Sequence, residues 1–256
     1  MIPCSSPSCR IIGVLILCGL TAFITWSLCR PDGDPVAGQE LTQESRDTLL
    51  VQQLLGENLS TRRFAFPTIV QASAERQVIP LDKGTESHRR VIAAIRTALD
   101  ESVEKLSRSD SPIRKLRRIN EGSRFFEESL LEKINATEGL VCEIPTNREG
   151  EHQRSGYPDL KVVDETSGDI FYLDPKLVEQ DSWRSSFRTF YFEPKTKTLK
   201  INDDAVHLLV GIGHDGKSGA WTFGEWKIVD LSTLTVRLKA EFQASNADLY
   251  KSGDKE

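Results

Sequence analysis

Two aspartates and a lysine stand at the open end of a predicted β-hairpin, in the stretch GYPDLKVVDETSGDIFYLDPKL. The polar DETSGD segment is a turn signal between two short apolar runs. A turn centred on Ser167 and Gly168 sets Asp159 opposite Lys176. Because residues two apart share one face of a strand, Asp159, Asp174 and Lys176 are expected on the same side of the hairpin.

This arrangement predicts a metal-assisted reaction on a phosphate. Opposed and diagonal residues of a hairpin lie about 4.5 to 8 Å apart, so two carboxylates there repel and each tends to a raised pKa. A divalent cation relieves the repulsion, and carboxylate oxygens are ligands that Mg²⁺ prefers. A neighbouring lysine can orient or deprotonate a water, or stabilise charge developing on a phosphate. Spacing alone equally allows a surface salt bridge between Asp159 and Lys176, which would contribute little.

The same residues resemble a known signature. Pro158-Asp159, fourteen intervening residues and then Asp174-Pro175-Lys176 are similar to the PD-(D/E)xK motif of the restriction-endonuclease-like nuclease superfamily, type II restriction enzymes in particular. The preceding segment RFFEESLLEKI also fits, because that superfamily carries a helix glutamate that completes the metal site. The resemblance covers roughly residues 85–245.

The resemblance implies a role for each residue of the motif. Asp159 and Asp174 would be metal ligands, Lys176 the catalytic lysine, and Glu127 the helix acid. At 100° per residue Glu127 points with the apolar face of its helix, and Glu128 at the edge is the second candidate. For either glutamate, a solvated helix charge is the competing interpretation.

The resemblance also implies a Mg²⁺-dependent endonuclease, with Mn²⁺ as a substitute, that hydrolyses phosphodiester bonds in double-stranded DNA. Cutting both strands would favour a homodimer. Arg184 and Arg188, four residues apart just after the motif, could contact phosphates, which the fork of an arginine binds in bidentate fashion. The basic run RKLRR is a second candidate and is more simply interpreted as a solvated helix face.

One residue departs from the usual pattern. Pro175 occupies the variable position of the motif, inside a predicted central strand, where proline cannot donate a ladder hydrogen bond. The alternative function is therefore a catalytically inactive, membrane-anchored binding or scaffolding domain that keeps the nuclease fold.

The elements around the motif predict an α+β fold, an α/β mixed-sheet core flanked by helices. An apolar stripe predicts a helix from Thr85 to about Ser107, and SRFFEESLLEKIN predicts a second one. Pro67 predicts that TRRFAFPTIVQAS is irregular or extended. Beyond Cys142 the residue pattern predicts strands, in the runs LKVV, IFYL, FYFEP, HLLVGIG, WTFGEWKIVDL and LTVRLKAEFQA. Helices first and strands after indicate a mixed sheet packed on helices.

Composition sets wider limits. The 256 residues carry a net charge of −5, with 38% hydrophobic and 28% charged residues, an ordinary globular balance. No CxxC spacing suggests a zinc site. We expect a tail over 1–10, a transmembrane helix over 11–29, a linker and short helix over 30–60, a nuclease-like domain over 61–250, and a polar tail over 251–256.

The predicted transmembrane helix is the run IIGVLILCGLTAFITWSLC. It has no charged residue and is just long enough to span a bilayer, which predicts a single-pass membrane protein. An uncleaved signal is nearly equivalent, and a start codon downstream of Met1 would make the segment an artefact of start-site assignment. Flanking charges leave open the side on which the nuclease-like domain lies.

Overall fold

The computed structural model describes residues 42–59, 61–185, 190–195, 197–239 and 243–245. These fall into two units, Met1–Glu57 and Asn58–Glu256. In the first unit, helix α2 (Gln43–Gly56) starts after Thr42, whose hydroxyl accepts a hydrogen bond from the Ser45 backbone N–H at 3.2 Å. None of its residues is buried.

The second unit is built on a mixed six-stranded sheet in the order β2-β6-β5-β4-β3, with β7 paired to β6. Strand β5 runs parallel to β6 and antiparallel to β4. Two short strands, β1 and β8, form a separate antiparallel pair. The strands are β1 (Arg63–Ala65), β2 (Val78–Ile79), β3 (Leu140–Glu143), β4 (Leu160–Asp164), β5 (Ile170–Glu179), β6 (Ala205–His214), β7 (Phe223–Asp230) and β8 (Thr235–Arg237).

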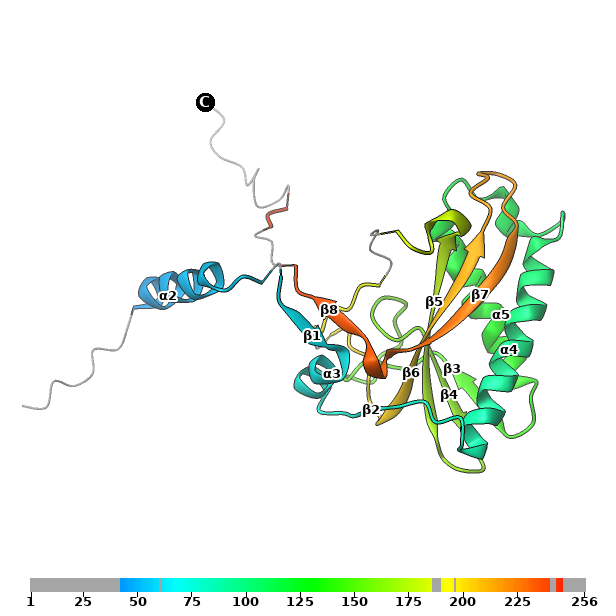
Figure 1. Cartoon of the computed structure of the whole chain (residues 1–256), viewed down its shortest axis with the longest axis horizontal. Helices are drawn as coiled ribbons and strands as arrows, with labels where there is room; N and C mark the ends of the chain where they lie inside the picture. The colour runs from blue at the N-terminus through cyan, green and yellow to red at the C-terminus, as the bar shows by residue number, and fades with distance from the viewer. Residues whose placement is uncertain (1–41, 60, 186–189, 196, 240–242, 246–256) are drawn as a thin grey trace, which may run out of the picture. The chain divides into compact units, whose positions relative to one another are not determined.

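Helices cover the two faces of this sheet unequally. The long helices α4 (Glu86–Ser107) and α5 (Ser123–Asn135) lie side by side along one face, and the short helix α3 (Phe66–Ala74) lies with β1 and β8 toward the other (Figure 1). The predicted helix over 85–107 is confirmed to within one residue. The described residues of this unit also form four 3₁₀ turns: η1 (Pro112–Lys115), η2 (Ile119–Gly122), η3 (Gln180–Ser182) and η4 (Leu231–Thr233).

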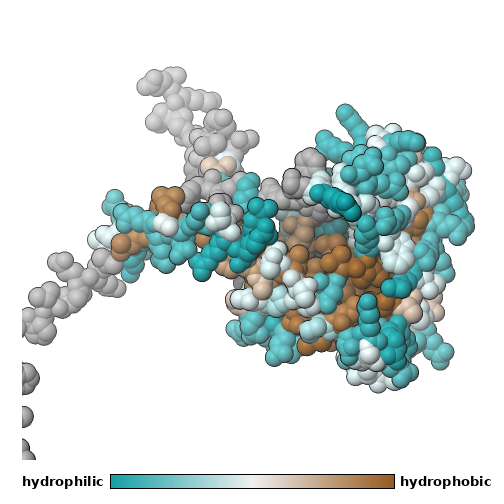
Figure 2. All heavy atoms as spheres, viewed as in Figure 1, coloured by the Kyte–Doolittle hydropathy of each residue, from teal (hydrophilic) through white to brown (hydrophobic). Residues whose placement is uncertain are grey.

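The sheet separates two apolar cores. Phe171 and Leu173 of β5 pack with α4 and α5, whereas Tyr172 between them packs with α3. Since side chains alternate along a strand, Asp174 and Lys176 lie on the same face as Tyr172. Figure 2 shows apolar residues over the middle of the visible face of this unit and hydrophilic ones around its rim.

Two expectations about secondary structure were wrong. The segment around Pro67 is helical, because the proline occupies the first turn of α3, where its missing N–H breaks no hydrogen bond. The FYFEP run forms no strand. Its two phenylalanines, Phe190 and Phe192, instead pack edge-on against Phe66 of α3. The run is apolar because these side chains pack on the core, although the backbone pairs with no strand.

The predicted membrane segment, 11–29, lies outside the described residues. Within the part of the chain that the structure describes, no helix is both long and apolar enough to cross a bilayer.

The hairpin forms, but in a different register from the predicted one. Leu160 pairs with Leu173, and the backbone N–H of Asp164 donates to the carbonyl of Asp169 at 3.0 Å. Asp164 shifts the turn, because its Oδ1 accepts hydrogen bonds from the N–H groups of Thr166 and Ser167, and Gly168 closes the loop at φ +78°.

The shift moves every partner by two places, which keeps each side chain on its predicted face. Asp159, one position before β4, is thereby brought beside Asp174, whereas the sequence predicts Lys176 opposite it, and its N–H donates to the Leu173 carbonyl at 3.2 Å.

Candidate active site

The candidate site lies where β4 and β5 part, a place we call the fork. The ladder between these strands ends at Leu160 and Leu173, whereas β5 continues along β6 to Glu179. Strand N–H groups point alternately to the two neighbours, so the Asp164–Asp169 bond places the N–H position of residue 175 on the β4 side. Pro175 thus costs no hydrogen bond to β6. Just beyond the ladder the Asp159 N–H donates to the Leu173 carbonyl at 3.2 Å, one residue out of the ladder register.

Three charged side chains meet at the fork. Lys176 Nζ lies 2.8 Å from Asp174 Oδ2 and 3.3 Å from Asp159 Oδ2. The side chains of Asp174, Asp159 and Lys176 are 4%, 16% and 25% exposed. A surface salt bridge is therefore excluded for this group, because pairs of that kind sit in solvent. The predicted constellation of two aspartates and a lysine is assembled.

Burial controls the charge of the group. It raises the pKa of Asp174 to about 7, with the adjacent Asp159 carboxylate adding to the rise and Lys176 opposing it. Burial alone would lower the pKa of Lys176, but Asp174 and Asp159 together outweigh it and the pKa is raised. Burial is thus the first cause of the raised pKa of Asp174, the two carboxylates cause the raised pKa of Lys176, and an additional cation would relieve the repulsion between the carboxylates.

The carboxylates fit a divalent cation of the hard, oxygen-binding kind. Asp174 Oδ2 is buried, and the contact that balances its charge is the ion pair with the Lys176 ammonium at 2.8 Å. A carboxylate has further oxygen lone pairs beyond that contact, and a cation would coordinate them. Among the residues described, no three His, Cys, Asp or Glu side chains converge into a ready ligand set. The fit therefore rests on Asp159 and Asp174, with waters filling the other positions.

Glu127 lies near this group without joining it. Its side chain is half-buried, and its pKa is raised first by burial and then by the charge of Asp159. Glu128 is exposed and pairs with Arg154 at 3.3 Å. The helical phase argument thus predicted correctly that Glu127 is the more buried of the two glutamates. The expected cluster of three carboxylates that includes Glu127 is not formed in this geometry.

Sequence reasoning missed a second lysine. Lys200 is only 1% exposed, and the acids that act on it electrostatically are Asp159, Glu127 and Asp174. It belongs to no motif and lies in a segment without helix or strand. The available signal was weak: Leu199 and Ile201 flank it in an alternating pattern typical of a buried extended segment.

The two predicted phosphate-binding arginines have different outcomes. Arg184 is exposed just beyond η3, which is compatible with a role in binding. Arg188 lies outside the described residues. In the basic run before α5, Arg114 donates to the Ser107 carbonyl at 3.1 Å, whereas Lys115, Arg117 and Arg118 are exposed.

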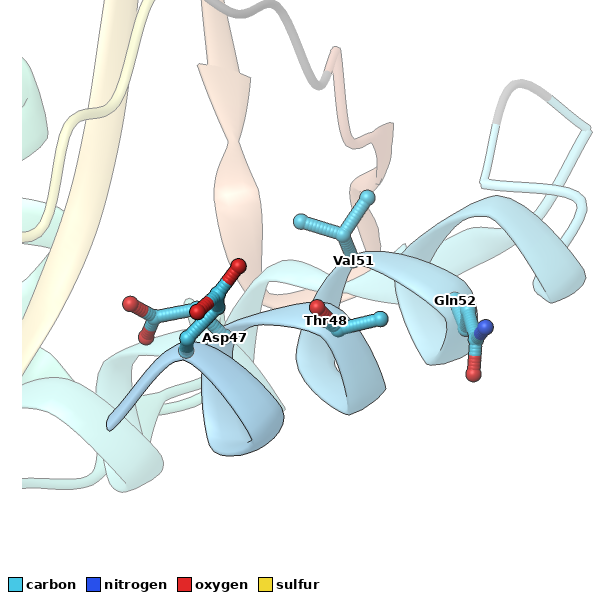
Figure 3. A pocket seen from close by; sticks show the side chains of 5 residues that line it. Asp47, Thr48, Val51 and Gln52 are labelled. Carbon is cyan, nitrogen blue, oxygen red and sulfur yellow. The ribbon is translucent and has the colours of Figure 1, made fainter. Parts of the chain in front are cut away.

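Two other features carry no chemistry of this kind. His207 is buried in the α3-side core, where burial lowers its pKa to about 3, and its Nδ1 lies 2.9 Å from the Tyr157 hydroxyl. A shallow hollow on α2 is lined by residues of this one helix only, with Asp47, Thr48, Val51 and Gln52 spread along it (Figure 3). All are exposed except the half-buried Val51, so this hollow encloses nothing.

Comparison with known proteins supports a nuclease site at the fork. A family model described as the Type II restriction enzyme MjaV family matches residues 59–253, a span that includes the whole hairpin, α5 and Lys200. The Type II restriction enzyme MjaV of Methanocaldococcus jannaschii is 27% identical over 199 residues, which cover 74% of this chain and 86% of that protein. The chain therefore belongs to the type II restriction enzyme MjaV family, a family of endodeoxyribonucleases.

Proposed function

We propose that this protein hydrolyses phosphodiester bonds in double-stranded DNA at the fork, and that the reaction depends on Mg²⁺. The observation that carries the proposal is the Lys176 ammonium held between Asp159 and Asp174 where the hairpin opens. Family membership supports DNA as the substrate.

Asp159 and Asp174 would hold the cation, with Mn²⁺ as a substitute. When bound, the ion would polarise the scissile phosphate. The chain's own residues do the remaining work. Lys176, whose pKa is raised, stays protonated at neutral pH and holds positive charge where negative charge develops on the phosphate. It would also orient a water bound beside the two carboxylates.

The DNA would be held partly by Arg184, and by Arg188 four residues further along the chain, through contacts to backbone phosphates. Such contacts position the duplex without reading its sequence. Breaking both strands requires two active sites or two successive cuts, so a homodimer is part of the proposal. Attachment to a membrane through residues 11–29 also remains a proposal.

The direct test is a cleavage assay on the full chain with plasmid, linear duplex and single-stranded DNA. With Mg²⁺ we expect discrete fragments from duplex DNA, and with EDTA none. Replacing Mg²⁺ by Mn²⁺ should preserve cutting. A purified, folded protein that cuts none of these DNAs with either ion would reject the function.

The two helix glutamates offer a matched pair of variants. Glu127→Gln removes a negative charge that acts on Asp159, so we expect weaker metal binding and roughly 10- to 100-fold slower cleavage at limiting Mg²⁺. Glu128→Gln removes only an exposed ion pair with Arg154 and should cut like wild type. The measurement is the cleavage rate as a function of Mg²⁺ concentration, and equal curves for both variants would remove Glu127 from the site.

The inactive-scaffold alternative loses its structural support at Pro175. The ladder hydrogen bond that a proline inside a central strand would lose is not lost here, because its N–H position faces away from β6. A titration with Mn²⁺ separates the two functions. Saturable binding that disappears in Asp159→Ala supports an enzyme, and a scaffold without a metal site would bind none.

A further inference from the structure

Lys200 is fixed beside the first residue pair of the motif. Its backbone N–H donates to the carbonyl of Tyr157 at 3.0 Å, directly before Pro158 and Asp159. The contact is close: a Cβ atom on Gly156, whose φ is +94°, would lie 1.8 Å from the carbonyl oxygen of Thr198. Leu199 and Ile201 anchor the segment in the α3-side core.

The side chain is buried without a direct counter-charge. Only 1% of the residue is exposed, and no carboxylate of the described residues lies within ion-pair distance of its ammonium. Burial lowers its pKa, while Asp159, Glu127 and Asp174 counteract that effect from further away. Burying an unpaired ammonium costs folding free energy, so a lysine at this position indicates a functional role.

The charges of the site indicate which function. With its carboxylates ionised, the group contains Asp159, Asp174 and Glu127 against Lys176 and Lys200, one net negative charge. One divalent cation would make this one net positive charge, which is the complement of a single phosphodiester. Without Lys200 the loaded site would be neutral and would hold a phosphodiester less tightly.

We propose that Lys200 is a second lysine of the active site and contacts a non-bridging oxygen of the scissile phosphate. The proposal rests on the nuclease function proposed above. Lys176 sits between the carboxylates, whereas the ammonium of Lys200 has no ion-pair or hydrogen-bond partner among the described residues and would take the substrate phosphate as its partner. The competing interpretation is that Lys200 only balances charge within the folded protein.

The test uses Lys200→Met in the full chain, because methionine has a similar length without the charge. We expect cleavage of duplex DNA to slow about 100-fold. Mn²⁺ should bind about tenfold more tightly, since a repelling cation is gone. The slope of log Kd for uncut duplex, measured with Ca²⁺ against log salt concentration, should fall by about one. The thermal unfolding temperature should not fall, because a buried charge has been removed.

The matched control is Lys197→Met, an exposed lysine in the same segment, which should match wild type in every measurement. Wild-type cleavage by Lys200→Met, or unchanged Mn²⁺ affinity, would overturn the proposal. If Lys200→Met does not fold, Lys200→Gln replaces it, and failure of both to fold makes the residue structural and rejects the role. An inactive wild-type protein would instead reject the nuclease function itself.

Discussion

Replacing Asp174 by asparagine should abolish DNA cleavage, by at least about 10³-fold in kcat, while the protein stays folded. The carboxylate is 4% exposed and in contact with Lys176, so both the cation and the lysine lose their central partner. Asparagine keeps the shape and therefore leaves the packing intact. The measurement is single-turnover cleavage of duplex DNA with saturating Mg²⁺, beside a binding assay on the same DNA.

The same variant should gain stability at high pH. The pKa of Asp174 is raised in the folded protein to about 7, from an ordinary value of 3.8. The folded state thus binds a proton more tightly than the unfolded state, and ionisation destabilises the fold as pH rises from about 4 to 7. Asparagine does not ionise, so we expect a gain on the order of 1 to 3 kcal/mol at pH 8, shrinking towards pH 5.

A suitable control stands at the other end of the same hairpin. Asp164 is fully buried, and Arg90 donates to it at 2.6 and 2.9 Å. Asp164→Asn should lose stability, since Arg90 counters the effect of burial and the carboxylate pKa is lowered, yet kcat should persist below the unfolding temperature. An active Asp174→Asn protein would remove this residue from the mechanism.

Replacing Lys176 by methionine should also stop cleavage, with the opposite effect on stability. Two carboxylates would remain at the fork without the ammonium that now lies 2.8 and 3.3 Å from them. We expect a loss of about 2 kcal/mol at pH 8, since one partner of a largely buried ion group is removed. The loss should diminish at pH 5, where Asp174 takes up a proton. Chemical unfolding at both pH values measures this.

A divalent cation should reverse that loss. Mn²⁺ or Ca²⁺ would supply the missing positive charge, so it should raise the unfolding temperature of Lys176→Met more than that of wild type. Lys133→Met, which removes an ion pair with Glu101 between α5 and α4, provides the control because its stability should not respond to the ion. If the cation shifts neither protein, the two aspartates do not form a metal site.

Local patterns were enough to predict the hairpin and its chemical face. The apolar runs and the turn signal fixed which side chains share a face, and a register shift of two preserves that result. The exact partners were not predictable in this way, because they depend on Asp164 capping the loop with its own carboxylate. That Glu127 is more buried than Glu128 was predictable from helical phase, since α5 is regular and its apolar stripe is unambiguous.

Lys200 could not be predicted because its position depends on tertiary packing. No periodicity connects it with Asp159. The connection is a single backbone hydrogen bond to Tyr157 and the absence of a side chain at Gly156. The strand expected over FYFEP failed for a related reason, since aromatic residues that pack on Phe66 and residues of a ladder give the same apolar signal.

The two prolines at the fork have a consequence for how the enzyme meets its substrate. The two strands of a hairpin tend to form cross-strand hydrogen bonds wherever donors and acceptors are present, which would ordinarily close a gap between them. Just beyond the ladder the Asp159 N–H still donates to the Leu173 carbonyl at 3.2 Å, but Pro158 before it and Pro175 of β5 have no N–H to donate. These two prolines are part of the covalent chain, so the fork exists before DNA or metal arrives and little ordering entropy remains to be lost there on binding.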